Sequence, residues 1–279
     1  MSAMRGVSYA VFSVAAWSTN YLVGRFLVAG GVDPVAMSIL RFAVATPLLF
    51  LMARFPPYRG AARRLALLGL LGVAGFNLLL YSSLAYVTAA VASLFVVLAS
   101  PTTQLLEAAL ARRRPSGVAL LGSLAAAAGA YLTLEPYLSV RSYLGPLLAA
   151  LATLSWAVYT VFVRGVYRLY SPIGAMAWIS LFGLAAMSPA AAASRPAIQA
   201  DPLVLALVAY VAVVPGALAC AAWNVAVQKA GPRRSAAVLP LMPVLTTLLS
   251  YLLLGEAPTA TQLAGMAVAV AGVYISARG

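Results

Sequence analysis

Long apolar stretches follow one another along almost the whole chain, with only short polar breaks between them. A helix that crosses the hydrocarbon core of a bilayer needs roughly 20 apolar residues. Charged residues make up only 8% of the chain, whereas in soluble domains they make up roughly a quarter. The sequence therefore predicts an all-α membrane protein with ten transmembrane helices. These cover residues 6–29, 34–54, 64–85, 88–111, 116–134, 143–166, 172–193, 202–227, 232–254 and 259–277.

Lysine and arginine residues gather at alternate connections between these segments. With the N-terminus inside, all but four of the 18 lie on the inner side; the exceptions are Arg41, within the second segment, and Arg25, Arg141 and Arg195 outside. Cytoplasmic loops are enriched in these residues. We therefore expect a monomer in the lipid bilayer of the bacterial inner membrane, with both termini cytoplasmic. The net charge of +13 does not indicate nucleic-acid binding, because the basic residues are scattered between apolar segments.

Residues that carry enzymatic chemistry are scarce. The chain has no histidine and a single cysteine, so the sequence predicts no metal site, no cofactor and no catalytic group, and disfavours an intramembrane enzyme. The five acidic residues are Asp33, Glu107, Glu135, Asp201 and Glu256. Only Glu107 is expected inside a helix, near its cytoplasmic end. No chain of carboxylates crosses the membrane, which disfavours a carboxylate-based proton antiporter and a site for strongly cationic drugs.

The two halves of the chain repeat each other. A tryptophan precedes an arginine by eight residues in each half; the pairs are Trp17 with Arg25 and Trp156 with Arg164. The stretch ASPTTQLL around Pro101 returns as LMPVLTTLL around Pro243, and a Gly-x6-Gly helix ends each half. Each half holds five expected helices, so the second half, 142–279, enters the membrane with opposite polarity to the first, 1–136. Such an inverted repeat of two five-helix halves is typical of alternating-access transporters.

These features resemble the drug/metabolite transporter superfamily, EamA type. The resemblance rests on AAWSTNYLVGR in the first segment, PVAMSILRF in the second, SSLAYVTAAVASLFVVLASP over the third and fourth, and the two glycine-bearing helices. It covers essentially the whole chain and implies a transporter of small molecules. The aromatic residues resemble those of bacterial exporters of aromatic amino acids. The acidic residue usual after the fourth helix is replaced by Arg112, Arg113 and Arg114, which weakens a coupling role for such an acid.

Aromatic and polar side chains share one face of the first segment. Trp17, Asn20 and Tyr21 stand at i, i+3 and i+4, a spacing that places them on one side of a helix. Trp156 and Tyr159 repeat part of this face in the sixth segment. An amide in hydrocarbon needs a partner, so we expect this face to line a substrate cavity. The alternative is that Asn20 joins two helices and Trp17 fills the core.

A second set of candidate substrate-binding residues lies in the third and eighth segments. Asn77 and Tyr81 are four residues apart, and the repeat sets Tyr81 against Trp223 and the next residue against Asn224. Tyrosine and tryptophan offer a flat apolar surface with one hydrogen-bonding group. Such a lining suits a small organic solute with a ring or an aliphatic side chain. The alternative for Tyr81 is an aromatic belt at the membrane interface.

Three further residues are unusual inside expected helices. Pro101 and Pro243 each remove one backbone hydrogen bond and kink the helix. We expect them to be bending points for gating, and the alternative is that they shape the bundle statically. Arg41 is the one embedded cation; it could attract a substrate carboxylate, but we expect it to bond helix-end carbonyls or to extend towards the membrane surface.

The sequence thus predicts a transporter that exports amino acids, aromatic and other neutral apolar ones, by alternating access. We expect facilitated diffusion, because a cell with an excess of an amino acid needs only a selective exit. The alternative is an EamA-type exporter of drugs or other small metabolites, with or without proton coupling.

Overall fold

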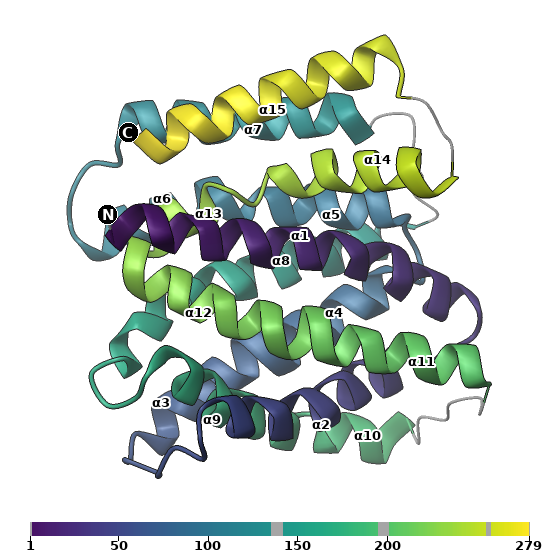
Figure 1. The fold of residues 1–279 in the computed structure, drawn as a ribbon, viewed down its shortest axis with the longest axis vertical. Helices are drawn as coiled ribbons and strands as arrows, with labels where there is room; N and C mark the ends of the chain where they lie inside the picture. The colour runs from purple at the N-terminus through teal and green to yellow at the C-terminus, as the bar shows by residue number, and fades with distance from the viewer. Residues whose placement is uncertain (1, 135–141, 195–200, 255–257, 279) are drawn as a thin grey trace.

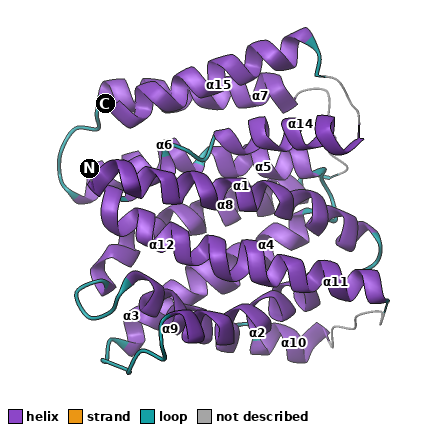
Figure 2. Cartoon of the chain, viewed as in Figure 1, coloured by secondary structure: helices purple, strands orange, loops and turns teal. Residues whose placement is uncertain are grey.

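The structure is a computed structural model and describes residues 2–134, 142–194, 201–254 and 258–278. Helices make up 84% of it, and no β-strand occurs in these ranges (Figure 2). The helices run side by side in one bundle, with both termini at the same end (Figure 1). We call this end the inner end and the opposite end the outer end, after the predicted orientation. Glu135, Arg141, Arg195 and Glu256 lie outside the described residues.

Several expected segments are built from two or three consecutive elements. The first half contains α1 Ser2–Ala29, α2 Pro34–Met52, α3 Ala62–Gly69, the π-helix η1 Leu70–Gly75, α4 Phe76–Ser83, α5 Ala89–Val97, α6 Ala99–Leu110 and α7 Gly117–Leu134. The second half contains α8 Leu144–Phe162, the 3-10 helix η3 Val163–Val166, α9 Pro172–Ala186, α10 Ser188–Ser194, α11 Pro202–Val211, the π-helix η4 Ala212–Leu218, α12 Ala219–Ala230, α13 Pro232–Ala236, α14 Leu241–Leu254 and α15 Ala260–Arg278.

Seven stretches of the described chain are long and apolar enough, by length and composition, to cross a membrane. They are Pro34–Met52, Ala62–Ser83, Ala89–Leu110, Gly117–Leu134, Leu144–Val166, Pro172–Ala193 and Pro202–Ala230. Ala260–Ser276 in α15 is apolar but shorter. The all-helical fold of the described chain is as predicted, while the count of ten spans and the inverted repeat stay predictions.

Two acidic residues act as helix N-caps. Asp33 Oδ1 accepts hydrogen bonds from the backbone N–H groups of Val35 and Ala36 at 2.9 and 2.8 Å, and Asp201 caps α11 in the same way. A proline follows each of them at the start of the helix. N-cap carboxylates satisfy N–H groups that a helix leaves unpaired, and proline suits the position after them. These acids therefore stabilise helix starts and do not form a path across the membrane.

Two π-helices interrupt the third and eighth expected segments, which the sequence pattern did not predict. At the end of η4 the N–H of Ala219 bonds to the Val214 carbonyl. An α-helix would instead pair Ala219 N–H with the carbonyl of Pro215, four residues earlier. The Pro215 carbonyl is therefore left free to accept bonds from side chains, and π-helical turns are frequent at functional sites.

Each proline expected to bend a helix follows an interruption. α5 ends at Val97 and α6 begins at Ala99, so Pro101 is the third residue of α6. Turns separate α13 from α14, and Pro243 is the third residue of α14. The first turn of a helix tolerates proline, because its N–H would have no intrahelical partner there. Whether these sites bend during transport stays a prediction.

The helices that end the two halves, α7 and α15, pack against each other at small residues (Figure 1). A Cβ atom on Gly122 would lie 2.8 Å from the Gly272 carbonyl oxygen, and one on Gly129 would lie 2.6 Å from that of Gly265. The later glycine of α7 contacts the earlier glycine of α15, so the two helices are antiparallel. The glycines therefore allow the two helices to pack closely.

Candidate functional site

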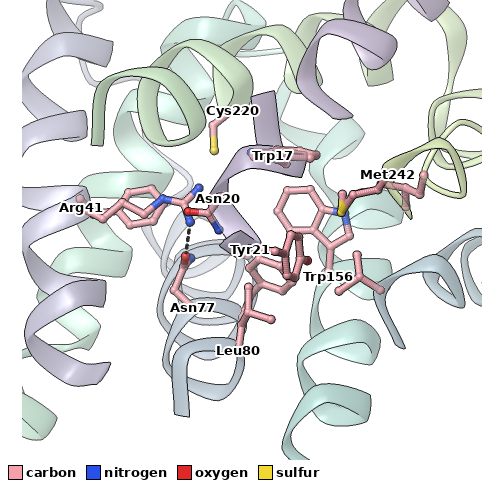
Figure 3. Close-up of a pocket in the computed structure, with 14 residues that line it drawn as sticks. Trp17, Asn20, Tyr21, Arg41, Asn77, Leu80, Trp156, Cys220 and Met242 are labelled. Carbon is pink, nitrogen blue, oxygen red and sulfur yellow. Dashed lines mark hydrogen bonds between the residues drawn. The ribbon is translucent and has the colours of Figure 1, made fainter. Parts of the chain in front are cut away.

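A central cavity lies between the two halves, with walls from α1, α2, α4, α8 and α12 (Figure 3). Its open space is about 20 Å³, room for about one water molecule. Five predicted site residues line it: Trp17, Asn20, Tyr21, Asn77 and Trp156. Since no amino acid fits this volume, substrate entry requires the helices to move apart.

Tryptophan rings form one wall of the cavity. The Trp17 and Trp156 ring centroids lie 5.1 Å apart with the ring planes at 89°, and Phe76 lies 5.0 Å from Trp156. Edge-to-face contacts of this kind are favourable between aromatic rings. Trp223 packs on both tryptophans, at 5.3 and 5.6 Å, but it is fully buried and is not among the lining residues. The predicted aromatic face is therefore a contiguous cluster, with Trp223 behind it.

Arg41 forms the opposite, polar wall and points from α2 towards Asn20 (Figure 3). Its Nη1 donates to Asn77 Oδ1 at 3.0 Å and to the Tyr81 hydroxyl at 3.2 Å, and its Nη2 donates to the Pro215 carbonyl at 2.9 Å. The side chain is only 2% exposed. The expectation that Arg41 extends to the membrane surface is therefore wrong, although it does bond a helix carbonyl. It is a cavity residue that the sequence interpretation left out of the site.

One edge of the Arg41 guanidinium is incompletely paired. Its Nε is buried and has no hydrogen-bond partner in the described structure. Nε and Nη2 lie on the same edge of a guanidinium and form the fork that binds a carboxylate with two parallel hydrogen bonds. A lone arginine in an apolar segment, without an acidic residue one turn away, was the signal that could have assigned it to the site.

The Pro215 carbonyl joins three helices at this wall. Besides Arg41, it accepts from Trp17 Nε1 at 2.9 Å and from the Cys220 thiol at 3.6 Å. These donors come from α2, α1 and α12. The π-helix η4 therefore positions the cation and one tryptophan through a single acceptor.

Two amide–phenol hydrogen bonds flank the cavity, one in each half. Towards the outer end the Tyr81 hydroxyl donates to Asn20 Oδ1 at 2.8 Å. Towards the inner end Asn224 Nδ2 donates to the Tyr159 hydroxyl at 2.9 Å. Asn20 and Tyr159 are repeat equivalents, and their partners Tyr81 and Asn224 lie on α4 and α12, one position apart in the repeat. We call these the outer pair, Asn20–Tyr81, and the inner pair, Tyr159–Asn224.

Tyr167 extends the inner pair, because its hydroxyl donates to Asn224 Oδ1 at 2.9 Å. Desolvation raises the pKa of Tyr167 well above its ordinary value, so the phenol is neutral and can donate this bond. Along α12, Cys220 lines the central cavity and Gln228 lines a second cavity at the inner end, with Asn224 halfway between them. The inner pair therefore separates the central cavity from the inner end.

Two adjoining cavities at the inner end carry a strong positive charge. The larger, about 540 Å³, is lined by Arg64, Arg164 and Arg168 with Glu107 as its carboxylate. The smaller, about 240 Å³, shares Glu107 and Arg164 and adds four basic residues, Arg113, Lys229, Arg233 and Arg234. We call this space, defined by these residues, the basic vestibule. It lies where the predicted cytoplasmic side would be.

The remaining predicted residues lie one layer from the cavity. Tyr81 is fully buried and bonds to the lining residues Asn20 and Arg41, while Tyr159 and Asn224 form the inner pair. Lining residues without a polar or periodic signal in the sequence, among them Leu239 and Met242, were not predicted. No cluster of three or more metal-ligand side chains occurs in the part of the chain that the structure describes. The cavity therefore lies among the helices of the two halves, with these residues around it.

Comparison with known proteins decides the family. The sequence model of the EamA-like transporter family matches residues 4–135 and, a second time, residues 143–278. The chain belongs to the EamA-like transporter family. It is accordingly a membrane transporter and not an enzyme.

Three relatives of this transporter span most of its length. An uncharacterized transporter of Archaeoglobus fulgidus is 24% identical over 88% of this chain and 89% of its own. A probable terminal-alkyne amino-acid exporter of Streptantibioticus cattleyicolor is 24% identical over 99% and 94%. An uncharacterized protein of Pseudomonas aeruginosa is 31% identical over 94% and 90%. A crystal structure with 21% identity superposes with a TM-score of 0.82 over 98% of this chain and 97% of the other, which establishes a shared fold.

Proposed function

We propose that this transporter exports amino acids with aromatic or other neutral apolar side chains across the bacterial inner membrane. The observation that carries the proposal is the central cavity, where the buried guanidinium of Arg41 faces the rings of Trp17 and Trp156 (Figure 3). A guanidinium fork matches the geometry of a carboxylate. Flat aromatic surfaces accept an apolar side chain without a further polar partner. One relative is named as a probable terminal-alkyne amino-acid exporter. An amino acid of that kind carries both a carboxylate and an apolar side chain.

Alternating access is the mechanism that best fits this arrangement. The amide–phenol pairs lie on opposite sides of the tryptophans, one towards each end of the bundle. The family sequence pattern occurs twice, and the helices that end the halves are antiparallel, as an inverted repeat requires. Breaking the outer pair would open the cavity outwards, and breaking the inner pair would open it to the basic vestibule.

Transport driven by the cargo's own gradient is proposed rather than proton coupling. Asp33 and Asp201 are engaged as helix N-caps, and Glu107 lies 3.7 Å from Arg113 at the inner end. Intramembrane proton relays are built from Asp, Glu or His side chains. No such side chain lines the central cavity in the described structure.

Efflux from proteoliposomes tests the proposal. Vesicles loaded with labelled phenylalanine, methionine, threonine or a cationic dye are followed with and without a pH gradient. Saturable efflux of phenylalanine and methionine without a gradient is the expected result. Transport of the dye alone would contradict the cargo, and strict dependence on the pH gradient would contradict the facilitated mechanism.

Arg41 is the residue to vary in this assay. Arg41→Gln removes a charged hydrogen-bond donor to the carboxylate, a loss of about 1.5–3 kcal/mol, so KM should rise roughly 10- to 150-fold. Arg41→Lys keeps the charge but not the two-pronged geometry of the guanidinium. Its KM should lie between those of the parent and of Arg41→Gln. Membrane abundance and thermal melting show whether each variant folds. An unchanged KM in a folded Arg41→Gln protein would place the carboxylate elsewhere.

A further inference from the structure

The charge of Arg41 is not balanced by an acidic group at the central cavity. Within the described residues no aspartate or glutamate lines that cavity. Asp33 and Asp201 cap helices, and Glu107 pairs with Arg113 at 3.7 Å near the inner end. A buried charge without a counter-ion is unfavourable. The site therefore gains most from a ligand that brings one negative charge.

An ammonium group is disfavoured beside the tryptophan rings of the same cavity. Arg41 Nη2 and Trp17 Nε1 both donate to the Pro215 carbonyl at 2.9 Å, so an ammonium on the Trp17 ring would lie close to the guanidinium. Aromatic faces attract cations weakly, whereas two like charges at close range in a poorly solvated site repel strongly. A zwitterion is therefore attracted through its carboxylate and repelled through its ammonium.

The basic vestibule also favours a negatively charged solute, at the inner end. Arg64, Arg164 and Arg168 line its larger part beside Glu107 as the lining carboxylate. A cleft lined by one sign of charge raises the local concentration of ions of the opposite sign. A solute that enters the transporter from this end meets a positive potential before it reaches Arg41.

We infer that the preferred cargo is a net anion, a small carboxylate with an apolar side chain and no charged amino group. A 2-oxo acid or an N-acylated amino acid has this chemistry. The inference rests on the proposed function, because it keeps the carboxylate on Arg41 and the apolar side chain on the tryptophan rings. It shifts the preferred cargo from amino acids to related carboxylates whose amino group is absent or masked.

A net anion links export to the membrane potential without any protein carboxylate. The inside of a bacterial cell is electrically negative, so an anion moves outwards down the potential. For one charge, 100 mV favours the outside at equilibrium on the order of fiftyfold. A zwitterion carries no net charge, and its distribution is independent of the potential.

Three solutes with one side chain test the inference in proteoliposomes. They are N-acetylphenylalanine, an anion; phenylalanine, a zwitterion; and phenylalanine amide, a cation. The expected kcat/KM is at least about tenfold higher for the anion than for the zwitterion, with the cation slowest, because one unpaired charge is worth over 1.4 kcal/mol. With valinomycin and a potassium gradient, the anion should accumulate on the positive side, and reversing the gradient should reverse its accumulation.

The outcomes separate the inference from the function on which it rests. Equal or faster transport of phenylalanine overturns the anion preference and leaves the proposed function standing. Failure of all three solutes while the cationic dye is carried overturns the proposed function itself. An anion preference that ignores the imposed potential overturns the electrogenic mechanism.

Arg168→Gln tests the vestibule separately, with Arg63→Gln as the matched control. Both residues are exposed near the inner end, but only Arg168 lines the vestibule. Arg168→Gln should slow anion transport severalfold at low salt and little at high salt, because exposed charges are screened. Arg63→Gln should leave it unchanged, and equal effects of the two variants would contradict a role for the vestibule.

Discussion

Asn20 and Tyr159 are equivalent positions of the two halves that carry different side chains. Each bonds to a residue of the other kind, Asn20 to Tyr81 and Tyr159 to Asn224. Asn20 also lines the cavity. This amide therefore both faces the cavity and joins two helices. In both pairs the donor lies on α4 or α12 and the acceptor on α1 or α8, so the difference in sequence does not remove the symmetry of bonding.

Gly72 holds the inner pair by leaving room for a ring. A Cβ atom at this position would meet the Tyr159 ring, so Gly72→Ala should displace Tyr159 and weaken its bond to Asn224. We expect a loss of roughly 1–3 kcal/mol of stability, the usual effect of overpacking, and reduced transport. The measurements are thermal melting of the purified protein and efflux from proteoliposomes.

Gly117→Ala is the matched control for this prediction. It lies at the start of α7, and nothing stands within 4 Å of the added Cβ. This variant should melt and transport like the parent. If Gly72→Ala also behaved like the parent, the ring of Tyr159 would not be held in place by that contact.

At the scale of elements, helix interruptions shape the cavity. The sequence pattern predicted the apolar segments and singled out Pro101 and Pro243, because segment length and proline are local signals, while bending at these prolines stays a prediction. It did not predict η1 and η4, because a π-turn depends on hydrogen bonds between segments, such as those that Pro215 accepts. The sequence did not predict Arg41 as a cavity residue for the same reason, because its partners lie on two other helices.

Replacing Pro101 should join α5 and α6 into one straighter helix. Pro101→Ala restores an N–H group, and stability should change by less than about 1 kcal/mol because the site already tolerates helix geometry. The transport rate should fall severalfold while membrane abundance stays constant. Pro57→Ala, in an exposed connection between α2 and α3, is the control. A Pro101→Ala rate equal to that of the control would favour static shaping over bending.

At the scale of the whole molecule, the two pairs flank the cavity, one towards each end. Cys220, the only cysteine of the chain, lines this cavity and is 4% exposed. It is therefore a native probe of which side is open. The proposed exchange between inward and outward openings predicts slow modification of this thiol from either side in the parent protein.

Breaking one pair should change access to Cys220 on one side only. Tyr159→Phe removes the inner hydroxyl, and labelling by a membrane-impermeant maleimide should become faster from the inner side. Tyr81→Phe removes the outer hydroxyl, with the opposite result. Cys220→Ala gives the background. Equal acceleration from both sides in either variant would contradict two separate closures.

The π-turn leaves the Pro215 carbonyl without its α-helical partner, and this has a mechanical consequence. A π-turn contains one residue more than an α-turn, so its conversion to α-helix would rotate α12 by about 100° and shift it by about 1.5 Å. In that register Ala219 N–H would take the Pro215 carbonyl from Trp17, Arg41 and Cys220 together. The partner of one backbone carbonyl would then determine both the register of α12 and whether Arg41 is hydrogen-bonded to it.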